Sequence, residues 1–141
     1  MKQLTALVLG IGFVSLFQFQ TIAEEHSALA RVTVYWRGTA SGAGAAWNGA
    51  PLREGHCAVD PKKISYGSKV VFHDAECVAV DTGPAVVDRK AARSCGRSAA
   101  ERQAIVIDRF FDSKQRALAW AKSNPDFMVV RVRTPDTQLV Y

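Results

Sequence analysis

The strongest strand pattern in the chain is Ala104-Ile-Val-Ile-Asp-Arg-Phe-Phe111, a run of β-branched and aromatic residues. The next two residues, Asp112-Ser113, offer N-cap acceptors for a helix. That helix must end near Asn124-Pro125, because the residue before a proline avoids the helical region. The run Phe127-Met-Val-Val-Arg-Val132 then predicts a last strand, and residues 134–141 are interpreted as a C-terminal tail.

Upstream of residue 104 the same reasoning predicts further short strands. β-Branched, aromatic and apolar runs cover residues 31–36, 56–60, 68–72 and 77–81. A glycine-rich loop over 38–55 carries Trp47 as its one large side chain, and a loop of that length points to function. Residues 86–102 are expected to be helical in part, with a break at Gly96. Six or seven short strands with one clear helix favour a mainly β fold, a small β-barrel.

The composition is that of one globular domain. The 141 residues are 48% hydrophobic and 22% charged, which excludes a disordered or collagen-like chain. The net charge of +5 suits an acidic polymer or surface as a partner, but it is too small to indicate nucleic acid.

The N-terminus has the pattern of a secretory signal peptide. Lys2 precedes an apolar run from Leu4 to Phe19, and small residues follow in Thr21-Ile-Ala23. A transmembrane anchor is the alternative, since the run approaches the ~17 residues that span a bilayer. The small residues at the cut favour cleavage. We therefore expect residues 1–23 to be removed, leaving a secreted or periplasmic chain that starts near Glu24 and is not stably inserted in a membrane.

Export would place the three cysteines in an oxidising compartment, where disulfides persist. Cys57 lies three residues before Asp60 and Cys77 four before Asp81, so if these segments are neighbouring strands they predict a Cys57–Cys77 bridge with Cys95 free. Three buried, unpaired thiols are the alternative. No spacing of cysteine and histidine indicates zinc, and no Gly-x-Ser-x-Gly elbow indicates a serine hydrolase. Neither a metal nor a cofactor is predicted.

Three aspartates stand at comparable places on apolar strands. Asp60 and Asp81 each end the tripeptide Ala-Val-Asp, and Asp108 follows Ile105-Val-Ile107. A carboxylate in such a place is costly to ionise unless it is paired, hydrogen-bonded or functional. A barrel that gathers the three strand ends would bring the carboxylates together, and like charges raise the pKa of at least one of them. A protonated aspartic acid is what the acid-catalysed cleavage of a glycosidic bond requires.

Five motifs along the chain resemble those of the 3D domain, a family named for three aspartates. It is found in secreted cell-wall proteins and in the catalytic core of membrane-bound lytic transglycosylase A. The motifs are Gly55-His-Cys-Ala-Val-Asp-Pro61, Tyr66-Gly-Ser-Lys-Val70, Val80-Asp-Thr-Gly83, Ile107-Asp-Arg-Phe-Phe-Asp112 and Ala117-Leu-Ala-Trp120. The resemblance covers residues 31–133. It implies a six-stranded double-psi β-barrel with one or two short helices. It also implies a monomeric enzyme that cleaves peptidoglycan between N-acetylmuramic acid and N-acetylglucosamine.

The resemblance also implies roles for individual residues. Asp108 corresponds to the catalytic acid, Asp81 would orient and tune it, and Asp60 would hold the barrel floor or bind a sugar hydroxyl. Thr82 and Gly83 belong to the Asp-Thr-Gly motif and are expected to contact substrate. Two aromatic residues, Trp47 and Tyr35, are candidates for stacking on a sugar ring, with core packing favoured for Tyr35.

Two other functions fit the same residues. A non-catalytic carbohydrate-binding barrel, like the expansin-type relatives of this architecture, would keep the fold and the aromatic residues without turnover. A hard-cation site made of Asp60, Asp81 and Asp108 is the third hypothesis, since oxygen ligands suit Ca²⁺ or Mg²⁺. The basic segment 86–102 is expected to be a solvated charged face, with the carboxylates of stem peptides as its alternative partner.

Overall fold

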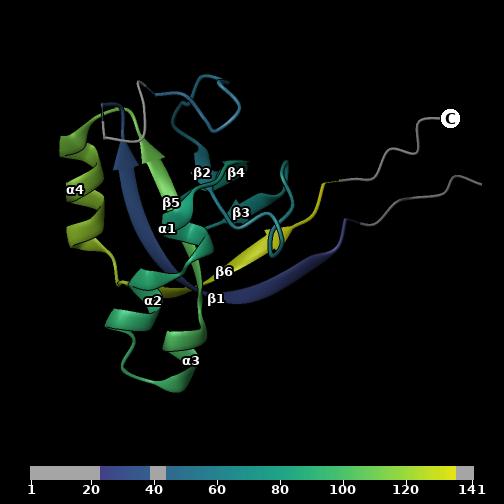
Figure 1. The fold of residues 1–141 in the computed structure, drawn as a ribbon, viewed down its shortest axis with the longest axis vertical. Coiled ribbons are helices and arrows are strands. Elements are labelled where there is room, and N and C mark those ends of the chain that lie inside the picture. The colour runs from purple at the N-terminus through teal and green to yellow at the C-terminus, as the bar shows by residue number, and fades with distance from the viewer. Residues whose placement is uncertain (1–22, 39–43, 136–141) are drawn as a thin grey trace, which may run out of the picture.

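The computed structural model describes residues 23–38 and 44–135, and it has a closed barrel of six strands (Figure 1). The strands are β1 (Glu25–Trp36), β2 (His56–Ala58), β3 (Lys69–Val71), β4 (Glu76–Asp81), β5 (Ile105–Phe111) and β6 (Phe127–Arg133). Their order around the barrel is β1-β5-β2-β4-β3-β6, with parallel and antiparallel neighbours mixed. The mainly β fold and the small six-stranded barrel are confirmed.

β1 is longer than its sequence pattern predicted. It begins at Glu25 rather than at residue 31, because its first half pairs antiparallel with β6 while its second half pairs parallel with β5. The first three added residues, Glu25 to Ser27, are polar and exposed, and Glu25 forms ion pairs with Arg131 and Arg133 of β6. Strand propensity does not detect such a segment, because main-chain pairing and charge hold it. Residues 1–22 of the expected signal peptide and residues 136–141 of the expected tail lie outside the described residues.

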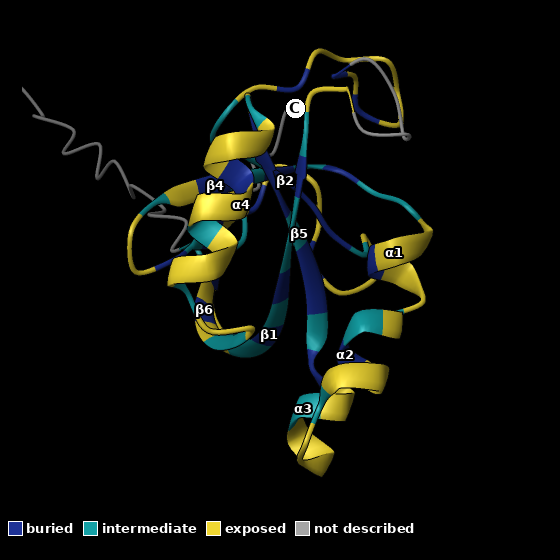
Figure 2. Ribbon diagram, turned by 90° about the vertical axis from the view of Figure 1, so that its left-hand side faces the viewer, coloured by how far each residue is buried: buried dark blue, intermediate teal, exposed yellow. Residues whose placement is uncertain are grey.

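The core has two parts, one inside the barrel and one outside its wall. The inner cluster takes alternate residues from all six strands, including Val32, Cys57, Val70, Ala79, Ile107 and Val132. The outer cluster packs two short helices and the loop before β2 against the outer faces of β1 and β5, and it includes Tyr35, Leu52, Ala58, Val86, Ala92, Val106 and Phe110. The buried residues of both clusters follow the strands in Figure 2. The space between barrel wall and outer cover is where the candidate site lies.

The described residues form four helices where one or two were expected. They are α1 (Pro84–Val87), α2 (Lys90–Cys95), α3 (Ala99–Gln103) and α4 (Lys114–Ser123). Pro84 starts α1 because its fixed φ suits the first helical position. Gly96 ends α2 as expected, and Ser98 and Glu101 form a capping box that starts α3. The partly helical segment predicted from its composition is therefore three short helices.

α4 follows the prediction closely. Ser113 accepts a hydrogen bond from the Arg116 backbone N–H, and the helix ends before Asn124-Pro125. α4 lies beside β1 and β5 (Figure 1). In the part of the chain that the structure describes, no helix has the length and apolar character needed to cross a bilayer.

A buried arginine links α4 to the barrel. Arg109 of β5 is 8% exposed, and its guanidinium lies 4.8–5.1 Å from the centres of three aromatic rings, which belong to Phe72, Phe111 and Trp120. It donates to both carboxylate oxygens of Asp74 at 3.0 Å, and the indole N–H of Trp120 donates to the same carboxylate at 2.9 Å. The cluster therefore ties together β5, the turn before β4 and α4.

The predicted Cys57–Cys77 bridge is wrong. All three cysteines lie among the described residues, and there each is a free thiol. The β2–β4 register places Ala79, not Cys77, beside Cys57. An offset of two residues between strands about 4.8 Å apart puts the Cα atoms roughly 8 Å apart, beyond the ~7 Å limit for a disulfide. Similar distances from the two aspartates, three and four residues, had suggested a register that the barrel does not adopt.

Candidate functional site

Two of the three aspartates face one another across a single residue. Asp108 stands at the middle of β5, in register with Ala58 of β2, and Asp81 ends β4, also in register with Ala58. Ile107 belongs to the inner cluster, so the alternation along β5 turns Asp108 to the outer face of the barrel wall. The small side chain of Ala58 leaves space between the two carboxyl groups.

That space is a pocket of about 110 Å³ whose outer wall is α1. Its lining comes from four strands, the turn after β4 and α1, and it consists of Tyr35, Ala58, Asp81, Thr82, Gly83, Pro84, Ala85, Val86 and Asp108. Five of the predicted site residues are thus brought together here. The volume is below the roughly 300 Å³ typical of small-molecule sites, so it suits one substituent of a larger ligand.

Asp108 is the titratable group of this pocket. Burial raises its pKa from 3.8 to about 6, a hydrogen bond from Thr33 opposes that rise, and the negative charge of Asp81 adds to it. The sequence had suggested like-charge repulsion as the cause, but burial is the larger one. Oδ1 of Asp108 is buried and has no hydrogen-bond partner among the described residues. Such an acid holds its proton closer to neutral pH and has an oxygen free for a ligand.

Asp81, in contrast, has both oxygens occupied. The hydroxyl of Tyr35 donates to Oδ2 at 3.1 Å, and the backbone N–H of Trp47 donates to Oδ1 at 2.7 Å. The residue is 8% exposed, so these two donors satisfy a buried carboxyl group. They also fix its position beside Asp108.

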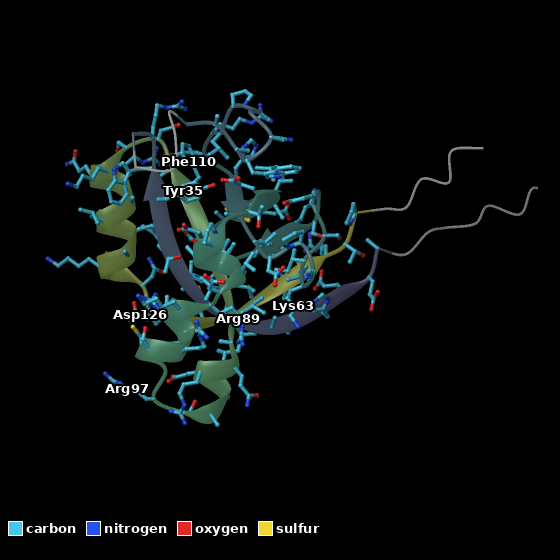
Figure 3. The ribbon with its side chains drawn as sticks, in the orientation of Figure 1. Tyr35, Lys63, Arg89, Arg97, Phe110 and Asp126 are labelled. Carbon is cyan, nitrogen blue, oxygen red and sulfur yellow. The ribbon has the colours of Figure 1, made fainter. Side chains whose placement is uncertain are left out.

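Tyr35 reaches the pocket with its hydroxyl and not with a ring face. Its ring is buried and packs edge-on against Phe110, with ring centres 5.3 Å apart and planes at 72° (Figure 3). Burial and the neighbouring Asp81 raise the pKa of the phenol, so the hydroxyl remains a donor at neutral pH. The core packing favoured for this ring is what the structure has, and no face is open for a sugar.

Thr82 and Gly83 line the pocket opposite the barrel wall. The hydroxyl oxygen of Thr82 is buried and has no partner among the described residues. A Cβ placed on Gly83 would meet no atom within 4 Å, so the space beside it is open. The two unpartnered polar atoms, from Thr82 and Asp108, thus belong to residues that line one small pocket.

Asp60 is not part of this pocket. It lies two residues beyond β2, where its Oδ1 accepts from the Lys62 backbone N–H at 3.0 Å and its carbonyl accepts from Lys63 and Ile64. The side chain therefore stabilises a turn. Within residues 23–38 and 44–135 no three His, Cys, Asp or Glu side chains are grouped to hold a metal ion, so the cation-site hypothesis lacks its ligand set.

The aromatic candidate Trp47 lies on the surface beside the pocket. Its side chain is 60% exposed and stacks on Tyr66, a residue that the sequence reasoning did not single out as a site residue. The clue was available, because Tyr66 opens one of the five family-like motifs. Only the folded chain places it against Trp47, nineteen residues earlier.

The basic segment 86–102 is in part structural. The Arg89 guanidinium donates to the carbonyls of Gln103 and Ala104 at 2.9 and 3.2 Å. Arg102 donates to the carbonyls of Gly96 and Arg97. Both arginines thus donate hydrogen bonds to backbone carbonyl groups at or just after the ends of α2 and α3. Figure 3 shows Arg97 away from the barrel and Arg89 close to it.

No protein-family model matches the chain, and no curated protein is similar enough in sequence to be a relative. The case for a function therefore rests on the pocket and on the motifs.

Proposed function

We propose that the protein is a lytic transglycosylase that cleaves peptidoglycan glycan strands between N-acetylmuramic acid and N-acetylglucosamine, with Asp108 as its single acid and base. The observation that carries this proposal is the Asp108 carboxyl group. It is buried in a polar pocket, burial raises its pKa to about 6, and one of its oxygens has no partner in the described chain. The resemblance to the 3D domain supports the same residue.

In the proposed reaction, protonated Asp108 donates its proton to the glycosidic oxygen as the bond to C1 of the muramic acid breaks. Positive charge then develops on that sugar ring. The carboxylate formed takes the proton of the 6-hydroxyl, whose oxygen attacks C1 and closes a 1,6-anhydro ring. One proton is given and one is taken back, no water is added, and no second carboxylate acts as a nucleophile, unlike the two-carboxylate scheme of glycosidases.

Asp81 would act on this reaction through charge and position. Its negative charge favours the protonated form of Asp108 in the free protein. Tyr35 and the Trp47 backbone hold it in place, so it stays near the sugar as positive charge develops there. Thr82 and Gly83 would contact the substituent that enters the pocket, and Asp60 would act only by holding its turn.

The proposed location is outside the cytoplasm, where peptidoglycan lies. The sequence pattern of residues 1–23 carries that part of the proposal. β1, the first strand of the barrel, begins at Glu25, after the expected cut at residue 23.

A non-catalytic carbohydrate-binding barrel is the second candidate. It is favoured by the small volume of the pocket, about 110 Å³, together with an exposed aromatic side chain beside it. In that case the same face binds a glycan and releases no product.

The test is a digest of purified peptidoglycan by the chain that starts at Glu24, analysed by mass spectrometry. We expect fragments with 1,6-anhydro ends, each lighter by one water than the hydrolytic product. Asp108→Asn keeps the side-chain shape but cannot give and reclaim a proton, so we expect a rate loss on the order of 10²–10⁴-fold. Asp60→Asn is the matched control, with a smaller effect. Ordinary reducing ends would refute the mechanism, and binding without fragments would favour the second candidate.

A further inference from the structure

An aromatic pair lies exposed at the edge of the pocket. The rings of Trp47 and Tyr66 are stacked, with centres 5.7 Å apart and planes 18° from parallel. Trp47 is 60% exposed and Tyr66 36% exposed. One face of each ring covers the other ring, so the pair offers an outer aromatic face to solvent. Leaving such apolar area in water is unfavourable, so an exposed aromatic pair of this kind indicates a binding surface.

Backbone hydrogen bonds connect the segments that carry both rings to β4. The Trp47 N–H donates to the Asp81 carboxylate, and the N–H of Gly67, next to Tyr66, donates to the Ala79 carbonyl at 2.9 Å. Ala79 and Asp81 are two residues apart on one strand. The pair therefore stands over the end of β4 that carries a pocket carboxylate.

The two loops that carry the rings are internally braced. In the first, the Ala46 N–H donates to the Ala50 carbonyl and the Leu52 N–H to the Gly44 carbonyl, at 2.7 and 2.6 Å, while Leu52 is buried. In the second, Gly67 adopts a φ of +84°, which suits glycine, and leads into the buried Ser68. A braced pair is a preorganised surface, which loses little freedom when it binds a ligand.

We propose that Trp47, backed by Tyr66, is a sugar-stacking subsite that holds a pyranose ring of the same glycan strand beside the unit at Asp108. The C–H bonds on a sugar face carry partial positive charge and fit the negative face of an aromatic ring. The identity of the ligand rests on the proposed function. The placement of the subsite rests on the geometry of the pair and of β4.

The charge of the surface around the pair distinguishes a sugar from other ligands that stack on aromatic rings. Single-stranded nucleic acid also uses such platforms, but it follows them with a cationic groove for its phosphates. The Trp47 backbone is bonded to Asp81, and the pocket that Asp81 lines also contains Asp108, so the neighbouring site carries two acidic side chains. A strand of sugar rings suits a platform beside two carboxyl groups better than a polyanion does.

The pair can be removed without disturbing the carboxylate it adjoins. Trp47 holds Asp81 with its backbone N–H, so Trp47→Ala deletes the ring and keeps that hydrogen bond. The experiment measures binding of a soluble, uncrosslinked peptidoglycan glycan by calorimetry and its cleavage by steady-state kinetics. We expect Trp47→Ala to raise Kd about tenfold, with the loss in KM rather than in kcat.

Three further variants sharpen the test. Tyr66→Leu removes the backing ring and should weaken binding, whereas Tyr66→Phe keeps a ring and should restore it. Leu118→Ala is the control, because Leu118 is also a large exposed apolar side chain, 48% exposed, but lies on α4. Its Kd should equal that of the parent. Thermal melting of every variant shows that the fold is kept.

Several results would overturn the subsite. It is refuted if Trp47→Ala binds the glycan as tightly as the parent does. It is also refuted if a single-stranded oligonucleotide binds the parent more tightly than the glycan does and loses that binding in Trp47→Ala. Binding that depends on Trp47 without any cleavage would support the subsite while refuting the transglycosylase. Cleavage that does not depend on Trp47 would support the transglycosylase while refuting the subsite.

Discussion

Asp81 and Asp108 share one pocket although β4 and β5, the strands that carry them, are not neighbours in the barrel. β2 runs between the two strands, and its Ala58 is in register with both aspartates. One carboxyl group has both oxygens bonded, and the other has an oxygen without a partner. The two aspartates thus have the same residue type in different environments, and the proposed reaction gives them different roles.

The stability of the protein should depend on pH through Asp108. Its pKa is about 6 in the folded chain against 3.8 for an unperturbed aspartate, so the folded state favours the protonated form. Stability should therefore fall as pH rises from about 4 to about 6, by up to roughly 3 kcal/mol. Asp108→Asn should not lose stability in this way, because the amide does not ionise. In urea unfolding the variant should match the parent near pH 4 and exceed it at about pH 7.5.

A parent protein that gained stability between those two pH values would contradict this account. The same ionisation predicts that cleavage declines as pH rises through about 6, because the acid form is consumed. A rate that rises through this range would instead mean that an ionised carboxylate starts the reaction.

Removal of the Tyr35 hydroxyl should loosen Asp81. Tyr35→Phe keeps the ring that packs on Phe110 but leaves Oδ2 of a buried carboxyl group without its donor. We expect a loss of about 1–3 kcal/mol in the free energy of unfolding, together with slower cleavage. Chemical denaturation measures the first. Tyr66→Phe, whose ring lies at the surface, is the control and should unfold as the parent does.

Arg109 should be among the most sensitive positions outside the pocket. Arg109→Met leaves Asp74 without its cation and three rings without the guanidinium between them. The Asp74 side chain is 33% exposed, so leaving it without its partner should cost about 1–3 kcal/mol. The pair of Arg116 and Glu54 offers a matched control, since its arginine side chain is 63% exposed and Arg116→Met should cost less than about 1 kcal/mol. Equal losses for the two variants would show that Arg109 does not brace α4.

The three cysteines should differ in reactivity. Burial raises the pKa of Cys77 to about 11 and that of Cys57 well above its usual range, while Cys95 is exposed. Alkylation of the native protein should therefore label Cys95 alone, and unfolding should expose the other two. Mass spectrometry of the labelled peptides reads this out. A Cys57–Cys77 peptide in a non-reduced digest would contradict the register of β2 and β4.

Most of the secondary structure was within reach of local reasoning. The helix from Lys114 to Ser123 begins after the N-cap residue Ser113 and ends before Pro125, and both signals are local in sequence. β5 is a run of β-branched and aromatic residues that local propensity detects. The first half of β1 was not predicted, because Glu25 and its neighbours pair with β6, which lies near the other end of the sequence. Polar residues at an exposed strand carry no local pattern of their own.

By itself, the sequence determined the strand-rich pattern, the helix that ends before Pro125, the small barrel and the three unusual aspartates, since each depends on residues close together in the chain. The tertiary structure alone decided that Asp81 and Asp108 meet across Ala58 while Asp60 serves a turn. It also decided that Cys57 lies beside Ala79 and that Tyr66 backs Trp47. The physical reason is that a shift of one residue in strand register reverses the face of every side chain, and register is set by pairing between segments far apart in sequence.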